Sequence, residues 1–206
     1  MTTVLQLNTS IHSANGHSSR IADQFVAGWR ARHPETTLIK RDFAAAPVPH
    51  LTAERFSAFT SKPADRSPAQ QAVVSYSDAL IEELKRADVV VLALPMYNFG
   101  VPSTLKAYFD HIARAGATFR YTEKGPVGLL GGKKVYVIAT RGGLYAGTPL
   151  DSETGYVRDL LNFLGMSDVE FIYAEGLAIS EAAKQAGLAH ARNAIERTLA
   201  PASAAA

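Results

Sequence analysis

The sequence contains no cysteine among its 206 residues. This absence excludes disulfide bonds, thiolate nucleophiles and the zinc or iron–sulfur sites that use cysteine ligands. It is compatible with a reducing compartment. The histidines at positions 12, 33, 50, 111 and 190 do not have the spacing of metal ligands, and single solvated or capping roles account for them. No metal site is therefore predicted.

Long apolar segments are also missing. The N-terminal stretch "MTTVLQLNTS" has neither the basic start nor the apolar length of a signal peptide. No segment approaches the roughly 20 apolar residues of a membrane span. We therefore expect a soluble, cytoplasmic protein that does not enter a membrane.

The chain has little excess charge of either sign. Its 21 Lys and Arg residues nearly balance 19 Asp and Glu residues, and the net charge of +2 is spread along the sequence. Two short basic clusters, at residues 29–33 and 131–134, fall where a helix should end and a strand should begin, so solvated turns explain them. Because a dedicated nucleic-acid binder gathers its basic residues into a patch, no nucleic-acid partner is predicted.

Three common functional motifs are absent as well. The sequence has no G-x-G-x-x-G after its first apolar run and no G-x-x-x-x-G-K-[ST], which disfavours a Rossmann dinucleotide site and a P-loop NTPase. It also lacks G-x-S-x-G, which disfavours a hydrolase of the nucleophile-elbow type.

What the sequence does contain is a regular alternation of apolar runs and helical patterns. Strands are predicted at residues 4–7, 89–94, 135–140 and 169–174, with a weaker candidate at 36–41. Between them apolar residues recur with helical spacing, for example Ile21, Phe25 and Trp29. The helix after the strand at 89–94 is expected to end near Gly116. Residues 180–199 are predicted to form a final, Ala-rich helix.

Uniformly apolar strands separated by helices indicate an α/β fold with a parallel sheet covered on both faces. Five such strands fit a flavodoxin-like order 2-1-3-4-5, in which ligands bind beyond the carboxyl ends of the strands. We expect one domain over residues 1–200 and a disordered tail at 201–206. The proline-broken segment 43–68 is expected to form a loop and a short helix whose apolar residues are candidates to face a partner subunit.

The first candidate loop, "NTSIHSANGHSSR", follows the first strand and is rich in hydroxyls. Free N–H groups at a helix start near Ser18, together with Ser and Thr hydroxyls, form a site for a phosphate dianion. An ordinary N-cap at Ser18 is the equally open alternative.

Two further loops follow neighbouring strands. In "PMYNFGVPS", Pro95 ends the strand, Ser103 can cap the next helix, and the aromatic, thioether and amide groups suit a planar heterocycle with polar edges; covering the end of the sheet is the alternative. In "TRGGLYAG", paired glycines let the backbone approach a ligand closely. A tight turn would be enough to explain Gly142 and Gly143. It would not explain why three unusual loops lie on one edge of the sheet.

The stretch "PMYNFGVPSTLKAYFDHIARAGATFRYTEKGPVGLLGGKKVYVIATRGG" resembles the FMN-dependent NADH-azoreductases, which are also described as quinone oxidoreductases. The likeness extends over nearly the whole chain, including "RIADQFVAGWRARHP" and "LNFLGMSDVEFIYAEGLA". It implies a flavodoxin-like homodimer with one FMN per subunit at the dimer interface. The implied reaction passes two electrons from NADH or NADPH to azo compounds and quinones by a ping-pong mechanism.

The resemblance also implies the site residues. Phosphate contacts fall on Ser10 and on the triplet Gly16, His17 and Ser18. The commoner triplet is hydroxyl–amide–hydroxyl, and Gly16 and His17 depart from it. Ring contacts fall on Met96, Tyr97, Asn98 and Phe99 and on Thr140, Arg141, Gly142 and Gly143.

The flavin carries the hydride chemistry, so no catalytic side chain is required. Backbone N–H groups of residues 96–99 are candidate donors to the reduced ring, and Arg141 either helps them or lies at the surface. Phe119 and Tyr121 are implied walls of the acceptor pocket, partly from the neighbouring subunit, with core packing as the alternative. A quinone reductase for which azo dyes are incidental, and an electron-transfer flavodoxin, are the competing functions.

Overall fold

A computed structural model describes residues 1–200; the predicted disorder of residues 201–206 lies outside the described part. Five parallel strands form one sheet in the order β2-β1-β3-β6-β7. Since β6 and β7 are the fourth and fifth strands of this sheet, the predicted order 2-1-3-4-5 is confirmed. The strands are β1 (Thr3–Asn8), β2 (Thr37–Asp42), β3 (Val89–Pro95), β6 (Lys134–Thr140) and β7 (Asp168–Ala174).

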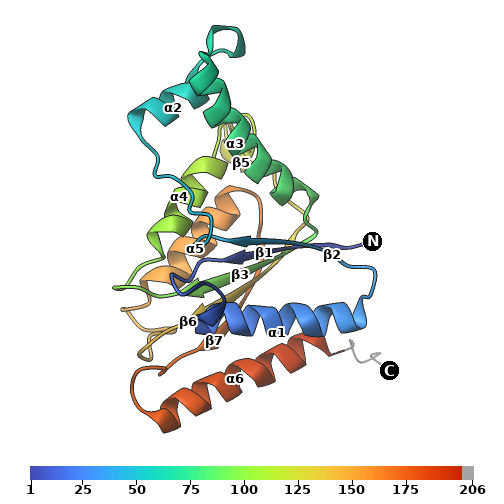
Figure 1. The fold of residues 1–206 in the computed structure, drawn as a ribbon, viewed down its shortest axis with the longest axis vertical. Coiled ribbons are helices and arrows are strands. Elements are labelled where there is room, and N and C mark those ends of the chain that lie inside the picture. The colour runs from blue at the N-terminus through green and yellow to red at the C-terminus, as the bar shows by residue number, and fades with distance from the viewer. Residues whose placement is uncertain (201–206) are drawn as a thin grey trace.

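Helices cover both faces of the sheet (Figure 1). On one face lie α1 (His17–Arg32) and α6 (Glu181–Leu199), and on the other lie α3 (Pro68–Arg86), α4 (Ser103–Ile112) and α5 (Ser152–Phe163). Among residues 1–200, no helix is both long and apolar enough to cross a bilayer.

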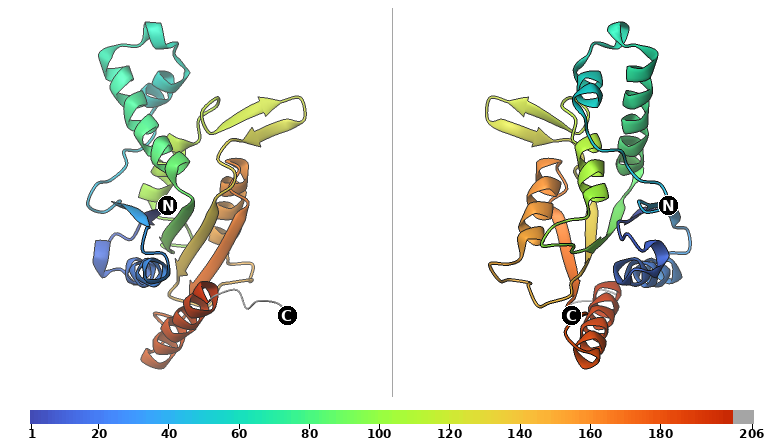
Figure 2. Two further views of the ribbon diagram at one scale, coloured as in Figure 1. Left: turned by 90° about the vertical axis from the view of Figure 1, so that its right-hand side faces the viewer. Right: turned by 60° about the vertical axis from the view of Figure 1, so that its left-hand side comes forward.

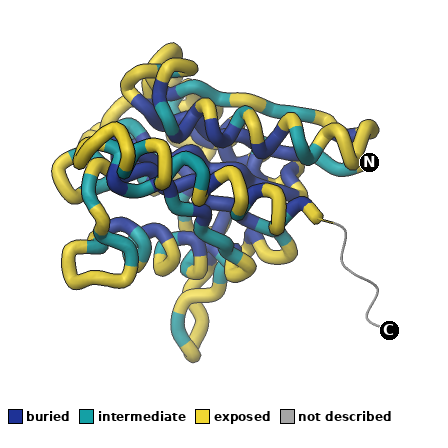
Figure 3. Tube along the Cα trace, turned by 90° about the horizontal axis from the view of Figure 1, so that it is seen from below, coloured by how far each residue is buried: buried dark blue, intermediate teal, exposed yellow. Residues whose placement is uncertain are grey.

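The central strand β3 explains why this sandwich forms. All seven of its residues are buried, and the first six alternate between two cores. Val90, Leu92 and Leu94 pack with α3, α4 and α5, whereas Val89, Val91 and Ala93 pack with α1 and α6. A strand without a polar face has to be covered on both sides. Figure 3 shows the resulting pattern, with buried backbone inside and exposed residues at the loops and outer helix faces.

Segment 43–68 contains the expected short helix, α2 (Ala53–Thr60), whose N-cap Thr52 accepts a hydrogen bond from the Arg55 amide at 3.2 Å. Single turns of 3₁₀ helix, η1 (Ser13–Asn15) and η2 (Pro63–Asp65), precede α1 and α3. A hairpin of β4 (Phe119–Thr122) and β5 (Gly125–Gly128) projects away from the sheet (Figure 2).

The predicted helix start near Ser18 is confirmed, whereas both candidate N-caps and the predicted end of α4 were wrong. Helix α1 begins at His17 with Gly16 as its N-cap, and α4 begins at Ser103 with Pro102 as its N-cap, so neither Ser18 nor Ser103 is a cap. Helix α4 ends at Ile112 rather than near Gly116. The Thr118 hydroxyl donates to the Ile112 carbonyl at 2.6 Å and accepts the Arg114 N–H at 3.0 Å, which replaces the bonds of a further helical turn.

One titratable group lies in the core between α2, α3 and α4. The His111 side chain is buried, with its ring edge-on to Phe59 and Tyr76 at 5.8 Å in each case. Its Nδ1 lies 2.8 Å from the Ala107 carbonyl, whereas its Nε2 has no partner. Burial lowers the pKa of His111 below its ordinary value, and the bond to Ala107 opposes this only in part.

We predict that this histidine makes the protein less stable in acid. The unfolded chain takes up the proton of His111 near pH 6.5, while the folded chain takes it up only at lower pH. The free energy of unfolding should therefore fall as the pH is lowered through about 6.5. In His111→Asn, which cannot titrate, urea denaturation should show a flatter dependence on pH. The exposed control His190→Asn should keep the wild-type dependence; the same dependence in both variants would contradict the prediction.

Candidate functional site

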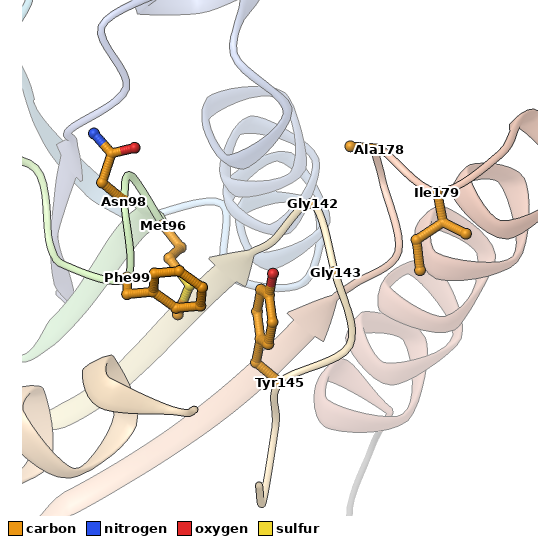
Figure 4. A pocket seen from close by; sticks show the side chains of 8 residues that line it. All are labelled: Met96, Asn98, Phe99, Gly142, Gly143, Tyr145, Ala178 and Ile179. Carbon is orange, nitrogen blue, oxygen red and sulfur yellow. The ribbon is translucent and has the colours of Figure 1, made fainter. Parts of the chain in front are cut away.

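Two adjoining pockets lie at the carboxyl edge of the sheet. The first, here called the loop pocket, has a volume of about 360 Å³ and lies against residues 10–17. The second, the aromatic pocket, has a volume of about 450 Å³ and is lined by Phe99, Tyr145, Gly142 and Gly143 among others (Figure 4). They share Met96, Gly142 and Ala178, so one ligand can occupy both.

The loop pocket is built on the start of α1. The Ser10 Oγ accepts the His12 N–H at 3.2 Å and lies 3.2 Å from the Tyr97 hydroxyl, which joins the loops after β1 and β3. The intervening turn is held by Ser13, whose φ of 50° is left-handed and whose hydroxyl donates to Asp42 at the end of β2. These bonds fix the path of the loop around the helix start.

Gly16 is required by close packing. A Cβ atom at this position would lie 2.2 Å from the Ser10 Oγ and 2.6 Å from the Ser10 Cβ. Rotating the Ser10 hydroxyl would relieve only the first contact. The absence of a side chain therefore lets the backbone close around the pocket.

The loop pocket fits an anion. The first N–H groups of α1 have no partner within the helix, and the positive end of the helix dipole lies there. The Ser18 Oγ is fully buried without a hydrogen-bond partner. His17 also lines the pocket, and burial together with nearby Lys184 and Arg20 lowers the pKa of its imidazole. Unpaired donors next to a cationic neighbourhood are what a phosphate group needs.

One wall of the aromatic pocket is a tight turn. Tyr97 and Gly100 exchange both backbone hydrogen bonds at 3.0 Å, while Asn98 and Phe99 between them have left-handed φ values of 50° and 60°. Such conformations cost about 1–3 kcal/mol each in residues other than glycine and gather at functional sites. The Ser152 hydroxyl donates to the Phe99 carbonyl and helps to hold the turn.

This turn directs the Phe99 ring toward Tyr145 on the opposite wall of the aromatic pocket. Phe99 remains 53% exposed, and its ring lies 5.5 Å from the Tyr145 ring. The Asn98 amide leaves the turn in another direction (Figure 4). The Met96 N–H is bonded to the Thr140 carbonyl and the Tyr97 N–H to Gly100, which leaves only Asn98 and Phe99 as free amide donors of the four predicted.

The opposite wall is formed by the segments that follow β6 and β7, which are hydrogen-bonded to each other. The Gly142 carbonyl accepts the Ala178 N–H at 3.0 Å, and the Gly143 carbonyl accepts the Gly176 N–H at 2.9 Å. A Cβ atom at Gly143 would lie 2.6 Å from the Tyr145 ring, so this glycine lets the aromatic ring fold back over the backbone.

Arg141 lies neither at the surface nor with its side chain in the aromatic pocket. Its backbone borders the loop pocket, while its guanidinium is fully buried beside Asp151, Glu175 and Glu153, at 2.6, 3.4 and 3.7 Å. The predicted surface role was therefore wrong. A cation can stay in the interior only if it has partners, and three carboxyl groups surround this one.

Phe119 and Tyr121 do not reach the two pockets within one chain. Phe119 is buried in the core with its ring 4.4 Å from Phe163, as the core-packing alternative expected. Tyr121 is 74% exposed on the hairpin. Both line a separate pocket of about 360 Å³ with Leu51, Phe56 and Phe59.

The other predicted residues come together, except that Ser18 is fully buried and lines neither pocket. Ser10, Gly16, His17 and Thr140 line the loop pocket; Asn98, Phe99 and Gly143 line the aromatic pocket; Tyr97 lines the loop pocket; and Met96 and Gly142 line both. The sequence reasoning missed Tyr145, Ala178 and Ile179. The last two follow β7, so extending the search to a fourth strand end would have found them. Residues 1–200 assemble no group of three or more His, Asp or Glu side chains suited to a metal ion.

Comparison with known proteins agrees with this geometry. A family model described as flavodoxin-like fold matches residues 2–199. The FMN-dependent NADH:quinone oxidoreductase of Cellvibrio japonicus is 51% identical over 200 residues, covering 97% of this chain and 100% of that protein. The FMN-dependent NADH:quinone oxidoreductase 6 of Burkholderia lata is 52% identical over 196 residues, covering 95% and 98%.

Solved structures show the same relationship. The azoreductase of Bacillus anthracis strain Sterne superposes with a TM-score of 0.85 at 28% identity, covering 96% of this chain and 100% of that one. An FMN-dependent NADH-azoreductase of Bacillus anthracis strain Ames Ancestor, solved in complex with FMN, gives a TM-score of 0.85 at 26% identity, covering 97% and 100%. The chain therefore belongs to the flavodoxin-like family of FMN-dependent NADH:quinone oxidoreductases and azoreductases.

Proposed function

We propose that this protein binds FMN and catalyses the two-electron reduction of quinones, and of azo compounds as further acceptors, with NADH as the electron donor. The observation that carries the proposal is the continuity of the two pockets through Met96, Gly142 and Ala178. An anion-binding helix start lies beside a flat aromatic pocket, and FMN combines a phosphate with a planar ring. The names of the relatives support the same cofactor and donor.

The loop pocket would hold the phosphate. The Ser10 hydroxyl and the N–H groups at the start of α1 would be the donors, and Gly16 gives the phosphate access to them. His17 lies at the same pocket and, as a neutral imidazole, can donate one hydrogen bond. Charge-assisted bonds of this kind are roughly twice as strong as neutral ones.

The aromatic pocket would hold the ring and the acceptor. Met96, Phe99, Gly142 and Gly143 offer flat surface, and the free Asn98 and Phe99 N–H groups offer donors to a polar ring edge. When bound, FMN supplies the hydride chemistry. Phe99 and Tyr145 hold planar substrates by stacking and exclude water from their faces.

Quinones are proposed as the principal acceptors because two relatives that are 51% and 52% identical to this chain are named for quinones. Azo compounds present a similar flat aromatic surface, and the more distant solved structures are named for them. A cytoplasmic location is proposed with this function.

We also propose that the protein is a two-fold symmetric homodimer whose sites are completed across the interface. The hairpin patch, defined by Leu51, Phe56, Phe59, Phe119 and Tyr121, has large apolar side chains in contact with water: Phe56 is 56% exposed and Tyr121 is 74% exposed. Phe99 is also half exposed beside its pocket. Exposed apolar side chains that gather in one patch usually mark an interface.

The function is tested by the cofactor and its reduction. Purified protein reconstituted with FMN should show a flavin visible spectrum that NADH bleaches without oxygen and a quinone then restores. A protein that takes up no FMN, or whose bound FMN is not bleached by NADH, would contradict the proposal.

A second prediction concerns the phosphate. In Gly16→Ala, the new Cβ should displace Ser10 and weaken FMN binding by about 10- to 100-fold, since charged hydrogen bonds contribute about 1.5–3 kcal/mol each. Riboflavin, which lacks the phosphate, should bind the variant and the wild type equally. Gly155→Ala is the matched control, because no atom lies within 4 Å of its new Cβ. An equal loss for riboflavin and FMN would contradict phosphate binding at this loop.

The third prediction concerns assembly. Light scattering should give twice the chain mass for the wild type, whereas Phe56→Ser should shift the protein toward the monomer because it removes apolar surface from the hairpin patch. Circular dichroism should show an unchanged fold, since Phe56 is already half exposed. A wild-type monomer with full quinone reductase activity would contradict a site shared between subunits.

A further inference from the structure

The buried Arg141 is connected to the glycine wall of the aromatic pocket through Glu175. The Glu175 Oε1 accepts three hydrogen bonds: from Arg141 Nη1 at 3.4 Å, from the Tyr145 N–H at 2.8 Å and from the Ala146 N–H at 2.8 Å. This carboxylate therefore fixes the loop that carries Gly143 and Tyr145. Arg141 supplies the positive charge that keeps the carboxylate in place.

The same guanidinium is connected to the opposite wall through Asp151. Arg141 Nη2 donates to Asp151 at 2.6 Å and to the Thr154 hydroxyl at 3.0 Å. Asp151 is the N-cap of α5 and accepts the Thr154 N–H at 3.1 Å. The first residue of that helix, Ser152, donates to the Phe99 carbonyl in the left-handed turn. One buried cation thus supports both walls.

A third carboxyl group, that of Glu153, faces Arg141 and has no hydrogen bond. The Glu153 side chain is fully buried, both of its oxygens lack a partner, and the nearer one lies 3.7 Å from Arg141 Nε, which also has none. Burial raises the pKa of Glu153 to about 8, with Asp151 adding to the rise and Arg141 opposing it. Burial would likewise raise the pKa of Asp151, but its bonds to Arg141 and Thr154 hold it below the ordinary value.

The charge balance of the cluster depends on this group. The charged and titratable side chains around it are Arg141 from the end of β6, Asp151 from the N-cap of α5, and Glu175 and Tyr173 from β7 and its exit; the Tyr173 ring lies 5.1 Å from the guanidinium. When Glu153 is protonated, the Arg141 guanidinium pairs with two carboxylates, those of Asp151 and Glu175. With Glu153 ionised, three carboxylates compete for that cation, and the longest bond, from Arg141 to Glu175 at 3.4 Å, is the first to yield.

We propose that Glu153 is a positioning residue that keeps both walls of the aromatic pocket in place while it is protonated. When it is ionised, it releases the glycine wall, which carries Tyr145. The proton leaves the Glu153 carboxyl for solvent, and the new carboxylate draws Arg141 away from Glu175. The consequence for binding rests on the proposed function: FMN should be held more weakly in alkaline solution. The movement of the wall itself does not depend on a cofactor.

The direct test is amide hydrogen exchange in the ligand-free protein, corrected for the intrinsic effect of pH. Protection of the Tyr145 and Ala146 amides should fall about tenfold between roughly pH 6.5 and pH 9.5, on either side of the Glu153 transition. In Glu153→Gln, which stays neutral, protection should not change with pH. Glu123→Gln, an exposed carboxylate on the hairpin, is the matched control and should behave like the wild type.

Constant protection in the wild type, or an equal loss in Glu153→Gln, would overturn the proposal. FMN titration over the same pH range supplies the functional readout: the dissociation constant should rise about fivefold in the wild type and less than about twofold in Glu153→Gln. Absence of FMN binding at every pH would refute the proposed function, while the exchange result would still decide the role of Glu153. An equal rise in both proteins would overturn that role.

Discussion

The burial of β3 on both faces is the constraint on which the rest of the structure depends. Seven consecutive residues without a polar side chain cannot border water, so helices have to cover the sheet on each side. Parallel strands with helical crossovers then bring their carboxyl ends to one edge. The loops after β1, β3, β6 and β7 meet there because the strands they leave are neighbours, although they are far apart in the sequence.

At that edge the backbone departs from ordinary conformations. Asn98 and Phe99 are both left-handed, and their turn is held by the paired backbone bonds between Tyr97 and Gly100 and by the Ser152 hydroxyl from a neighbouring segment. Local strain of this kind persists only where the surroundings enforce it. The buried ion pairs of Arg141 with Asp151 and Glu175 are part of those surroundings. The shape of the aromatic pocket therefore depends on charged side chains that do not line it.

The sheet order and most of the site could be predicted from the sequence because both follow from local patterns. Apolar runs such as residues 89–94 mark strands, and the hydroxyl, aromatic and glycine residues directly after them mark loops at one edge. The place of Arg141 could not be predicted in this way, since its partners Asp151, Glu153 and Glu175 lie on two other segments. The end of α4 also escaped, because the Thr118 side chain reaches back from six residues beyond it.

The contact between Gly16 and Ser10 has a consequence for how this loop can vary. A hydroxyl–amide–hydroxyl triplet at residues 16–18 would place a side chain where this chain has Gly16, and a Cβ atom there would lie 2.6 Å from the Ser10 Cβ. Grafting that triplet by exchanging residues 16 and 17 alone would therefore create a clash that no rotation of the Ser10 side chain relieves. The two positions are epistatic: a side chain at 16 is acceptable only with a different backbone path at 10, and the loop has to be exchanged as a unit.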